Sequence, residues 1–597
     1  MSQPGKPNAA PLALVGEAQA PVPERPRFAV YAKPTAFDGK TYRAGTWLHG
    51  VKHNNDGKAL PFDCWICAPL HILAETVNSE DGGIGRLLSF EHRGRVVELV
   101  MPLESLAGKG DDVLKALLRN GLLIDYQQRR HVPHYLSEQL PERVIATTTR
   151  PGWHESGVFV LPGRVIGSGE VRFQDSGRAV NPFTSKGDLA GWGAGIGAYC
   201  LGNPVLIAAV CCALAGPLLG RTGVHGGGLH LVGDSSSGKS LAQLVAASVW
   251  GNPATFAASW DQTRGGIEIE AASRNDTVLI LDEIKRADPK RVQEMAYAIA
   301  NGQGKGTMTR EREARAKLAW RVLVLSSGER SLSEHAAIGG NPAHAGAELR
   351  LADVDAGNRP HRAFDDVHGL SAQEFHRRLS DAVARHYGHL GPAFVEQLLI
   401  QPKAASLAEA FAAMRASFTA ENSQAGRVAD RFAVLALAGE LAIGWGLLGW
   451  PSGAAADACR RLFGEWLGRM GDGNAEDRQI LRGVADFIAM HCDSRFSDIR
   501  AEHPCVTVRD RAGYFETEGF GKERRLFLLN RPSLEEAGAG FSAERIVRAL
   551  VGADALAKVD TEAGQNRRTK RYRVPGGGTA RFYVIDPEKL DAAEASQ

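Results

Sequence analysis

Apolar and polar positions alternate with two different periods in the middle of the chain, from about residue 226 to residue 355. Short continuous apolar runs, such as 278–281, have the length of buried strands, and stretches with helical spacing lie between them. Along this segment the order is strand, glycine loop, helix, strand, helix, strand. Strands that alternate with helices predict a parallel α/β sheet covered by helices.

The flanking segments predict further parts. Residues 1–27 are rich in Pro and Ala and have little to bury, which predicts a disordered tail. Residues 28–181 hold short β-like runs separated by turn residues and one helical stretch at 111–120, which predicts a mixed, strand-rich domain. The remaining predicted parts are the α/β core at 182–400, a helical lid at 401–476 and a winged-helix-like domain at 477–597 with a helix at 542–556.

Residues 189–220 contain no charged side chain, so their length alone allows a transmembrane helix. Four glycines break the first half of this segment, and Asn203-Pro204 interrupts the middle. The stretch that remains, 205–216, is short for a bilayer and rich in Ala. We therefore predict a helix buried in front of the α/β sheet.

The composition of the 597 residues, with 44% hydrophobic and 23% charged, excludes a mostly disordered chain, a collagen-like repeat and a disulfide scaffold. Lys and Arg number 70 and Asp and Glu 68, a formal charge of +2. This total neither supports nor excludes nucleic acid binding, because that footprint is local. Eight cysteines and the absence of a secretory signal pattern predict a reduced, cytoplasmic location.

The strongest chemical signal is a match to G-x-x-x-x-G-K-[ST] that follows an apolar run and precedes an apolar helical pattern. Backbone N–H groups at the start of that helix would face phosphates, Lys239 would neutralise the β- and γ-phosphates, and Ser240 would ligate Mg²⁺. The motif therefore predicts that the chain binds ATP and Mg²⁺. Its residues are Gly233, Asp234, Ser235, Ser236, Ser237, Gly238, Lys239 and Ser240.

Two carboxylates follow the apolar run at 278–281. Asp282, at the end of the predicted strand, would help to hold Mg²⁺, and Glu283 would polarise the attacking water. This pair predicts ATP hydrolysis rather than binding alone. A third apolar run, 321–325, ends in polar residues, so Ser326 or Ser327 is the candidate that orients the water, and the sequence leaves that choice open.

A basic segment at 305–317 lies between two strands of the α/β core. A β-hairpin here would carry Lys305, Arg310 and Arg312 to phosphates in a central pore. The alternative is a solvated charged loop.

A second basic segment lies near the C-terminus, where a basic strand, a glycine turn and an aromatic-containing strand predict a wing. Its arginines and lysine would contact phosphates, and Tyr572 would stack on a base. The alternative is a solvated basic hairpin. The candidate phosphate contacts are Arg568, Lys570 and Arg571.

Several short motifs together resemble the bacterial and phage family of the domain of unknown function nine-two-seven. They include Trp260-Asp261-Gln262-Thr263, the run Leu281-Asp282-Glu283-Ile284, the glycine-rich stretch at 301–306 and Pro151-Gly152-Trp153-His154. The resemblance covers roughly residues 28 to 400 and is weaker beyond. Members of this family belong to mobile elements and prophages.

The resemblance implies a nucleotide core similar to AAA+ ATPases of the minichromosome-maintenance helicase type, assembled as a homo-oligomeric ring, expected to be a hexamer. It makes 305–317 the pore hairpin and Arg350 the arginine finger that reaches a neighbouring subunit's γ-phosphate. A second sensor arginine in the lid would be Arg427 or Arg431. The position of Ser326 and Ser327 departs from the asparagine usual in the wider AAA+ class.

These inferences predict an ATP-hydrolysing ring DNA helicase or translocase of a mobile genetic element or prophage, which supports its replication and threads single-stranded DNA past the pore hairpins. One alternative is an ATP-dependent remodeller or initiator that opens DNA without processive unwinding. Another is a nucleotide-gated assembly scaffold that does not act on DNA.

Overall fold

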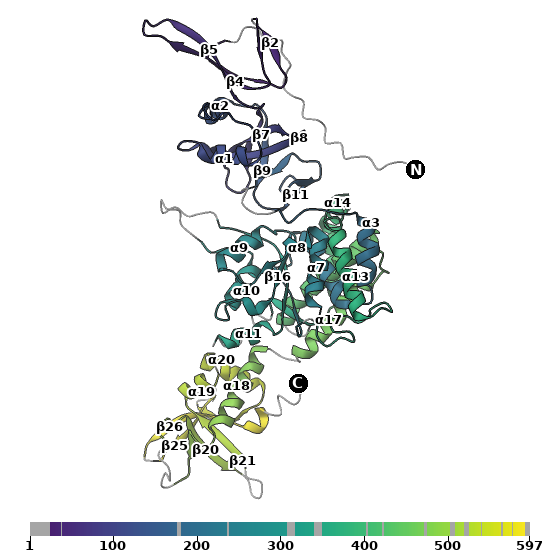
Figure 1. Cartoon of the computed structure of the whole chain (residues 1–597). Coiled ribbons are helices and arrows are strands. Elements are labelled where there is room, and N and C mark those ends of the chain that lie inside the picture. Colours follow the sequence, from purple (N-terminus) through teal and green to yellow (C-terminus); the bar gives the residue numbers. More distant parts are fainter. Residues whose placement is uncertain are drawn as a thin grey trace. The chain divides into compact units, whose positions relative to one another are not determined.

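The chain forms two compact units in the computed structural model (Figure 1). The first comprises Met1–Thr149 and Ser156–Ala179, and the second comprises Arg150–Glu155 and Val180–Gln597. Of the expected tail, residues 1–23 lie outside the described part. The structure describes residues 24–37, 39–175, 181–235, 238–306, 317–339, 349–400, 404–420, 423–470, 475–501, 508–518, 524–538, 540–562, 565–575 and 577–590.

The first unit is built mainly from strands, as the sequence predicts. One sheet has the order β1-β4-β5 and a second has the order β13-β9-β6-β7-β8. Helix α1 (Asp111–Arg119), which matches the predicted helical stretch, and α2 (His131–Glu138) pack into the same apolar core. The strands are β1 (Arg27–Tyr31), β4 (Gly45–His53), β5 (Ala59–Cys67), β6 (His71–Asn78), β7 (Ile84–His92), β8 (Arg95–Pro102), β9 (Val144–Thr148) and β13 (Val171–Phe173). Shorter strands are β2 (Thr35–Phe37), β3 (Lys40–Tyr42), β11 (Phe159–Leu161) and β12 (Arg164–Ile166).

Parallel strands form the central sheet of the second unit, in the order β15-β16-β17-β14-β18, which confirms the predicted parallel α/β sheet. One predicted boundary was wrong. The third strand runs from Leu323 to Gly328 rather than over 321–325, so Ser326 and Ser327 lie inside it and point to opposite faces. The strands are β14 (Gly227–Val232), β15 (Ala258–Ser259), β16 (Val278–Asp282), β17 (Leu323–Gly328) and β18 (Leu351–Asp355).

The predicted apolar helix is α5 (Pro204–Ala215), whose residues are all buried. Pro204–Thr222 is the one helical stretch of the described residues long and apolar enough to cross a membrane, and 83% of its apolar window is buried in the protein. Small Ala side chains let α5 pack closely against α7 (Lys239–Trp250) and α16 (Ser423–Gly444). This packing agrees with the predicted core helix.

The other helices of this part lie on both sides of the sheet (Figure 1). Those between the strands share one apolar core with β16 and β17, in which Trp260 and Trp320 are the largest side chains. The described residues of 401–476, where a lid is predicted, are mostly helical. The bounds are α9 (Arg264–Ala272), α10 (Val292–Asn301), α11 (Leu332–Ile338), α13 (Ala372–Arg385), α14 (Leu390–Ile400), α15 (Ala404–Ala416) and α17 (Ala454–Met470).

In the C-terminal part, α18 (Ala475–His491), α19 (Arg531–Ala537) and α20 (Ala543–Gly552) share a core with one face of a sheet. The helix predicted at 542–556 therefore ends four residues early, and Leu556 begins a strand because its backbone pairs with β26. The basic strand β25 pairs antiparallel with β26, as the predicted hairpin requires. The strands are β19 (Phe496–Asp498), β20 (Gly513–Glu518), β21 (Arg524–Leu529), β22 (Leu556–Lys558), β25 (Lys570–Arg573) and β26 (Thr579–Ile585).

Candidate nucleotide site

The glycine loop predicted to bind phosphates connects the C-terminal end of β14 to the N-terminal end of α7. Close packing requires two of its glycines. A Cβ on Gly233 would lie 2.8 Å from the backbone nitrogen of Gly357, and a Cβ on Gly238 would lie 2.8 Å from the ring of Phe364. Gly238 also has a φ of +113°, which side-chain-bearing residues rarely adopt. The sequence at these positions thus allows a tight loop wedged against the segment that follows β18.

Lys239 is 6% exposed and turns its ammonium back into the loop. Its Nζ donates to the carbonyls of Gly233 at 2.6 Å and Asp234 at 2.7 Å. Burial lowers the pKa of Lys239, and nearby carboxylates, Glu283 foremost, oppose that shift. The ammonium therefore lies among acidic groups at the mouth of the loop. Of the other predicted cofactor-binding residues, Ser235 and Ser240 are exposed, and Ser236 and Ser237 lie outside the described residues.

The two predicted carboxylates lie at the C-terminal end of β16 and are joined through Ser327. The Ser327 hydroxyl donates to Asp282 Oδ1 at 2.9 Å and accepts from the Glu283 backbone N–H at 3.3 Å. Glu283 has φ 56° and ψ 85°, a left-handed conformation that is unfavourable for a residue with a side chain. Its Oε1 is buried and accepts no hydrogen bond from the described residues.

Ser326, the alternative to Ser327, points into the core. Its Oγ accepts from Trp260 Nε1 at 2.9 Å and donates to His230 Nδ1, also at 2.9 Å. His230 Nε2 in turn donates to the Arg330 carbonyl at 2.9 Å. Burial lowers the pKa of His230 to about 4, so the imidazole is neutral at pH 7. Of the two serines, only Ser327 reaches the carboxylates.

Sequence reasoning missed two charged residues beside Glu283. The ammonium of Lys285 lies 3.9 Å from Glu283 Oε2 and 3.4 Å from Glu329 Oε1. Glu329 directly follows the end of β17, in the turn after the serines. Its position after a polar strand end was the available signal. Sequence reasoning also missed His230, although a polar residue within the otherwise apolar run of β14 was a signal in the sequence.

The predicted finger and lid arginines gather at the N-terminal ends of the parallel strands, where β18 begins, which is the end opposite the glycine loop. The Arg350 guanidinium lies over the Tyr297 ring, 3.6 Å from its centroid. Arg431 is 5% exposed and donates to the carbonyls of Leu349 and Arg350, the latter at 3.0 Å. Burial, reinforced by Arg350 and Arg427, lowers the pKa of Arg431 to about 10. Since the strands are parallel, neither lid arginine lies at the phosphate loop of its own chain.

The described ends of the predicted pore hairpin pair antiparallel. Gln303 bridges Ala319, and the Gly304 N–H donates to the Leu318 carbonyl at 2.8 Å. Lys305 is exposed just beyond this pairing. Arg310 and Arg312 lie outside the described residues.

In the C-terminal hairpin, Arg568 and Arg571 are exposed and Lys570 is half-buried. Tyr572 is engaged within the fold, because its hydroxyl donates to Glu516 Oε1 at 2.6 Å. Burial and this hydrogen bond raise the pKa of Tyr572. The predicted stacking of Tyr572 on a base therefore does not fit this structure, whereas the exposed arginines do face solvent.

Residues 39–318 match the family model described as a domain of unknown function, DUF927. This match agrees with the resemblance that the motifs of the region carry. No curated protein matches the chain. Among solved structures, the fold is similar to one described as SCCmec type IV Cch, active helicase, with a TM-score of 0.68. The two share 17% sequence identity, over 96% of this chain and 100% of that one.

Proposed function

We propose that this protein is an ATP-hydrolysing DNA helicase or translocase of a mobile genetic element or prophage, acting in the cytoplasm as a homo-oligomeric ring of the AAA+ type, expected to be a hexamer. One observation carries the proposal. Glu283 places a buried carboxylate oxygen, without a hydrogen-bond partner among the described residues, beside Asp282 and the glycine loop. A buried acceptor of this kind is unfavourable unless a ligand or water supplies the donor.

The triphosphate would lie in the loop from Gly233 to Ser240, against backbone N–H groups at the start of α7. Lys239 would exchange the carbonyls of Gly233 and Asp234 for β- and γ-phosphate oxygens, which its buried ammonium would bind more strongly. The loop residues Ser235, Ser236, Ser237 and Gly238 complete the cradle that we propose.

The Asp282 carboxylate and the Ser240 hydroxyl are hard oxygen ligands of the kind that Mg²⁺ prefers, so this donor set fits that ion. When bound, Mg²⁺ would neutralise charge on the phosphate oxygens. Ser327 keeps Asp282 oriented toward the loop and is our candidate for the sensor residue. Glu283 Oε1 would accept the proton of the attacking water and hold that water in line with the γ-phosphorus.

The arginines at the start of β18 are proposed to complete the nucleotide site of the adjacent subunit. Arg350, Arg427 and Arg431 bring like charges together, and burial of two of them disfavours those charges further. An anion bound between these arginines would reduce the repulsion between their charges. A nucleotide phosphate held by the next subunit would be such an anion. Arg431 would act through the Arg350 carbonyl, which fixes the backbone of the proposed finger.

DNA would be contacted by Lys305, with Arg310 and Arg312, as a single strand in the pore, and by Arg568, Lys570 and Arg571 through its phosphates. The exposure of Lys305 beyond an antiparallel pair of chain ends supports a projecting segment. The shared fold with a solved active helicase supports the same assignment.

The test is ATP hydrolysis and forked-duplex unwinding by the purified full chain. We expect K239A to lose nucleotide binding, E283Q to bind ATP but turn it over at least about 100-fold more slowly, and S327A to lose about tenfold in kcat. E409Q, an exposed Glu on α15, is the matched control. Hydrolysis by E283Q at the rate of E409Q would refute the assignment of Glu283. Hydrolysis without any unwinding would favour a remodeller.

A further inference from the structure

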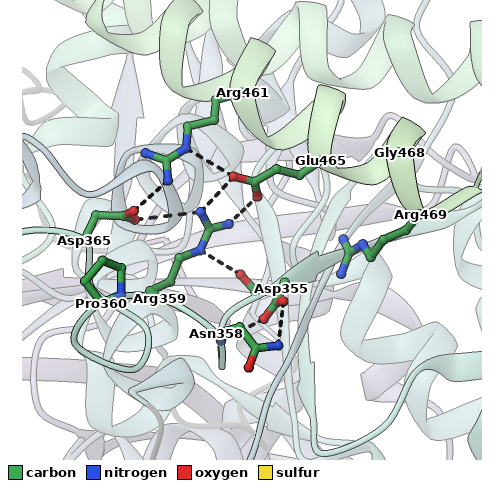
Figure 2. A pocket seen from close by; sticks show the side chains of 9 residues that line it. All are labelled: Asp355, Asn358, Arg359, Pro360, Asp365, Arg461, Glu465, Gly468 and Arg469. Atoms are coloured by element: carbon green, nitrogen blue, oxygen red, sulfur yellow. Dashed lines mark hydrogen bonds and ion pairs between the residues drawn. The ribbon is translucent and has the colours of Figure 1, made fainter.

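A polar cavity of about 400 Å³ lies between the end of β18 and helix α17 (Figure 2). Its lining combines guanidinium and carboxylate groups in equal number, and Figure 2 shows most of them joined by hydrogen bonds and ion pairs. None of these residues takes part in a step of the proposed reaction. The charged residues are Arg359, Arg461, Arg469, Asp355, Asp365 and Glu465.

Arg359 is the centre of this cluster. Its side chain is 5% exposed, and its Nη1 and Nη2 donate to the two carboxylate oxygens of Glu465, on α17, at 2.9 and 2.5 Å. Its Nε donates to the Asp355 carbonyl at 3.1 Å. Arg461, one turn before Glu465, donates to Glu465 at 3.1 Å and to Asp365 at 2.7 Å. The segment after β18 is thereby clamped to α17 at both of its ends.

The same segment rests on the proposed phosphate loop. The Asp355 carboxylate accepts from the N–H groups of Gly357 at 2.9 Å and Asn358 at 3.0 Å, which fixes the turn. Although burial opposes it, these hydrogen bonds lower the pKa of Asp355. Gly357 packs directly on Gly233, the first glycine of the loop. Further along, the Phe364 ring packs on the last glycine of the motif.

We propose that Arg359 is a positioning residue that couples the nucleotide in the glycine loop to helix α17. This inference rests on the proposed function. Phosphate binding would draw Lys239 away from the carbonyl of Gly233, and the change would reach Gly357 because no space separates the two glycines. The bidentate pair between Arg359 and Glu465 then transmits that shift to α17, since its two parallel hydrogen bonds define an orientation as well as a distance.

Coupling between two sites is reciprocal, so breaking the clamp must change nucleotide affinity. We expect R359A to raise the KM for ATP about five- to tenfold, the lower end of typical coupling, with kcat within about twofold of the wild type. R359K, which keeps the charge but loses the bidentate geometry, should be intermediate and serves if R359A does not fold.

The matched control is R460A, on the same helix, whose partner Asp457 is 71% exposed. Hydrogen exchange of residues 454–470 provides a second readout, because nucleotide should alter it in the wild type and in R460A but not in R359A. If the wild type hydrolyses no nucleotide, the proposed function is refuted and this inference with it. If the wild type is active and folded R359A matches R460A in KM and in exchange, only the role of Arg359 is refuted.

Discussion

The chain of hydrogen bonds through His230 predicts a specific dependence of stability on pH. Trp260, Ser326 and His230 are fully buried, and the only tautomer that satisfies all three hydrogen bonds carries its proton on Nε2. A protonated imidazole would carry a second proton, on Nδ1. That proton would point at the hydroxyl proton that Ser326 donates to the same nitrogen, so this hydrogen bond would be lost. The folded state therefore selects the neutral ring, with a pKa of about 4 against 6.5 for an unburied histidine.

The magnitude follows from that difference in pKa. Each unit corresponds to about 1.4 kcal/mol, so the neutral ring contributes about 3 kcal/mol of stability. Because the folded-state pKa is depressed, this contribution is complete above pH 6.5 and is lost as the pH falls toward 4. His230→Gln cannot be protonated, and its loss of hydrogen bonds should cost about 2 kcal/mol at pH 7.5. By pH 5 the wild type has lost a similar amount, about 2 kcal/mol, and the two proteins should converge.

Hydrogen exchange of the β14 amides at residues 227–232, corrected for intrinsic rates from pH 5 to 7.5, measures the local opening free energy. His376→Gln, at an exposed histidine on α13, is the control and should differ from the wild type by a small, constant amount. A deficit of His230→Gln that stays the same across this pH range would refute the buried neutral imidazole.

Two further substitutions test contacts outside the nucleotide site. Tyr572→Phe removes the hydroxyl that donates to Glu516, a residue 4% exposed, and should destabilise the C-terminal part by about 1–2 kcal/mol in thermal denaturation. Wild-type stability of this variant would contradict the structural role of the hydroxyl. Asp276→Asn keeps the shape of a fully buried side chain but removes the charge that binds Arg321 at 2.8 and 3.0 Å. Because the Arg321 side chain is half exposed, we expect a loss of about 2 kcal/mol in chemical denaturation, the size of a hydrogen bond to a charged group, and wild-type stability would contradict it.

Much of the central sheet and of the candidate site was predictable because the signals are local. An apolar run such as that of β16 must be buried on both faces, so the carboxylates that follow it lie at the sheet edge where parallel strands end. The spacing of Gly233, Gly238 and Lys239 is likewise a property of one loop. The apolar helix α5 was also predictable, because its interruption by Pro204 limits its length.

The choice between Ser326 and Ser327 was not predictable, because it depends on where the strand ends, and a shift of that end by one residue changes the outcome. The strand continues through both serines, and neighbouring residues of a strand face opposite ways, so a predicted end at 325 could not tell which side each would take. The same holds for Arg427 and Arg431. Helical spacing places them on one helix, but only packing against the start of β18 shows that they lie far from the loop of their own chain.

The sequence by itself determined the order of strands and helices in the core, the glycine loop and the acidic pair, since each depends on residues within about ten positions of one another. Tertiary structure alone decided which polar groups meet. Arg359 and Glu465 are 106 positions apart, and His230 and Ser326 are 96 apart. Such pairs form because buried charges and dipoles must find partners, and which partners are within reach depends on how the sheet and helices pack.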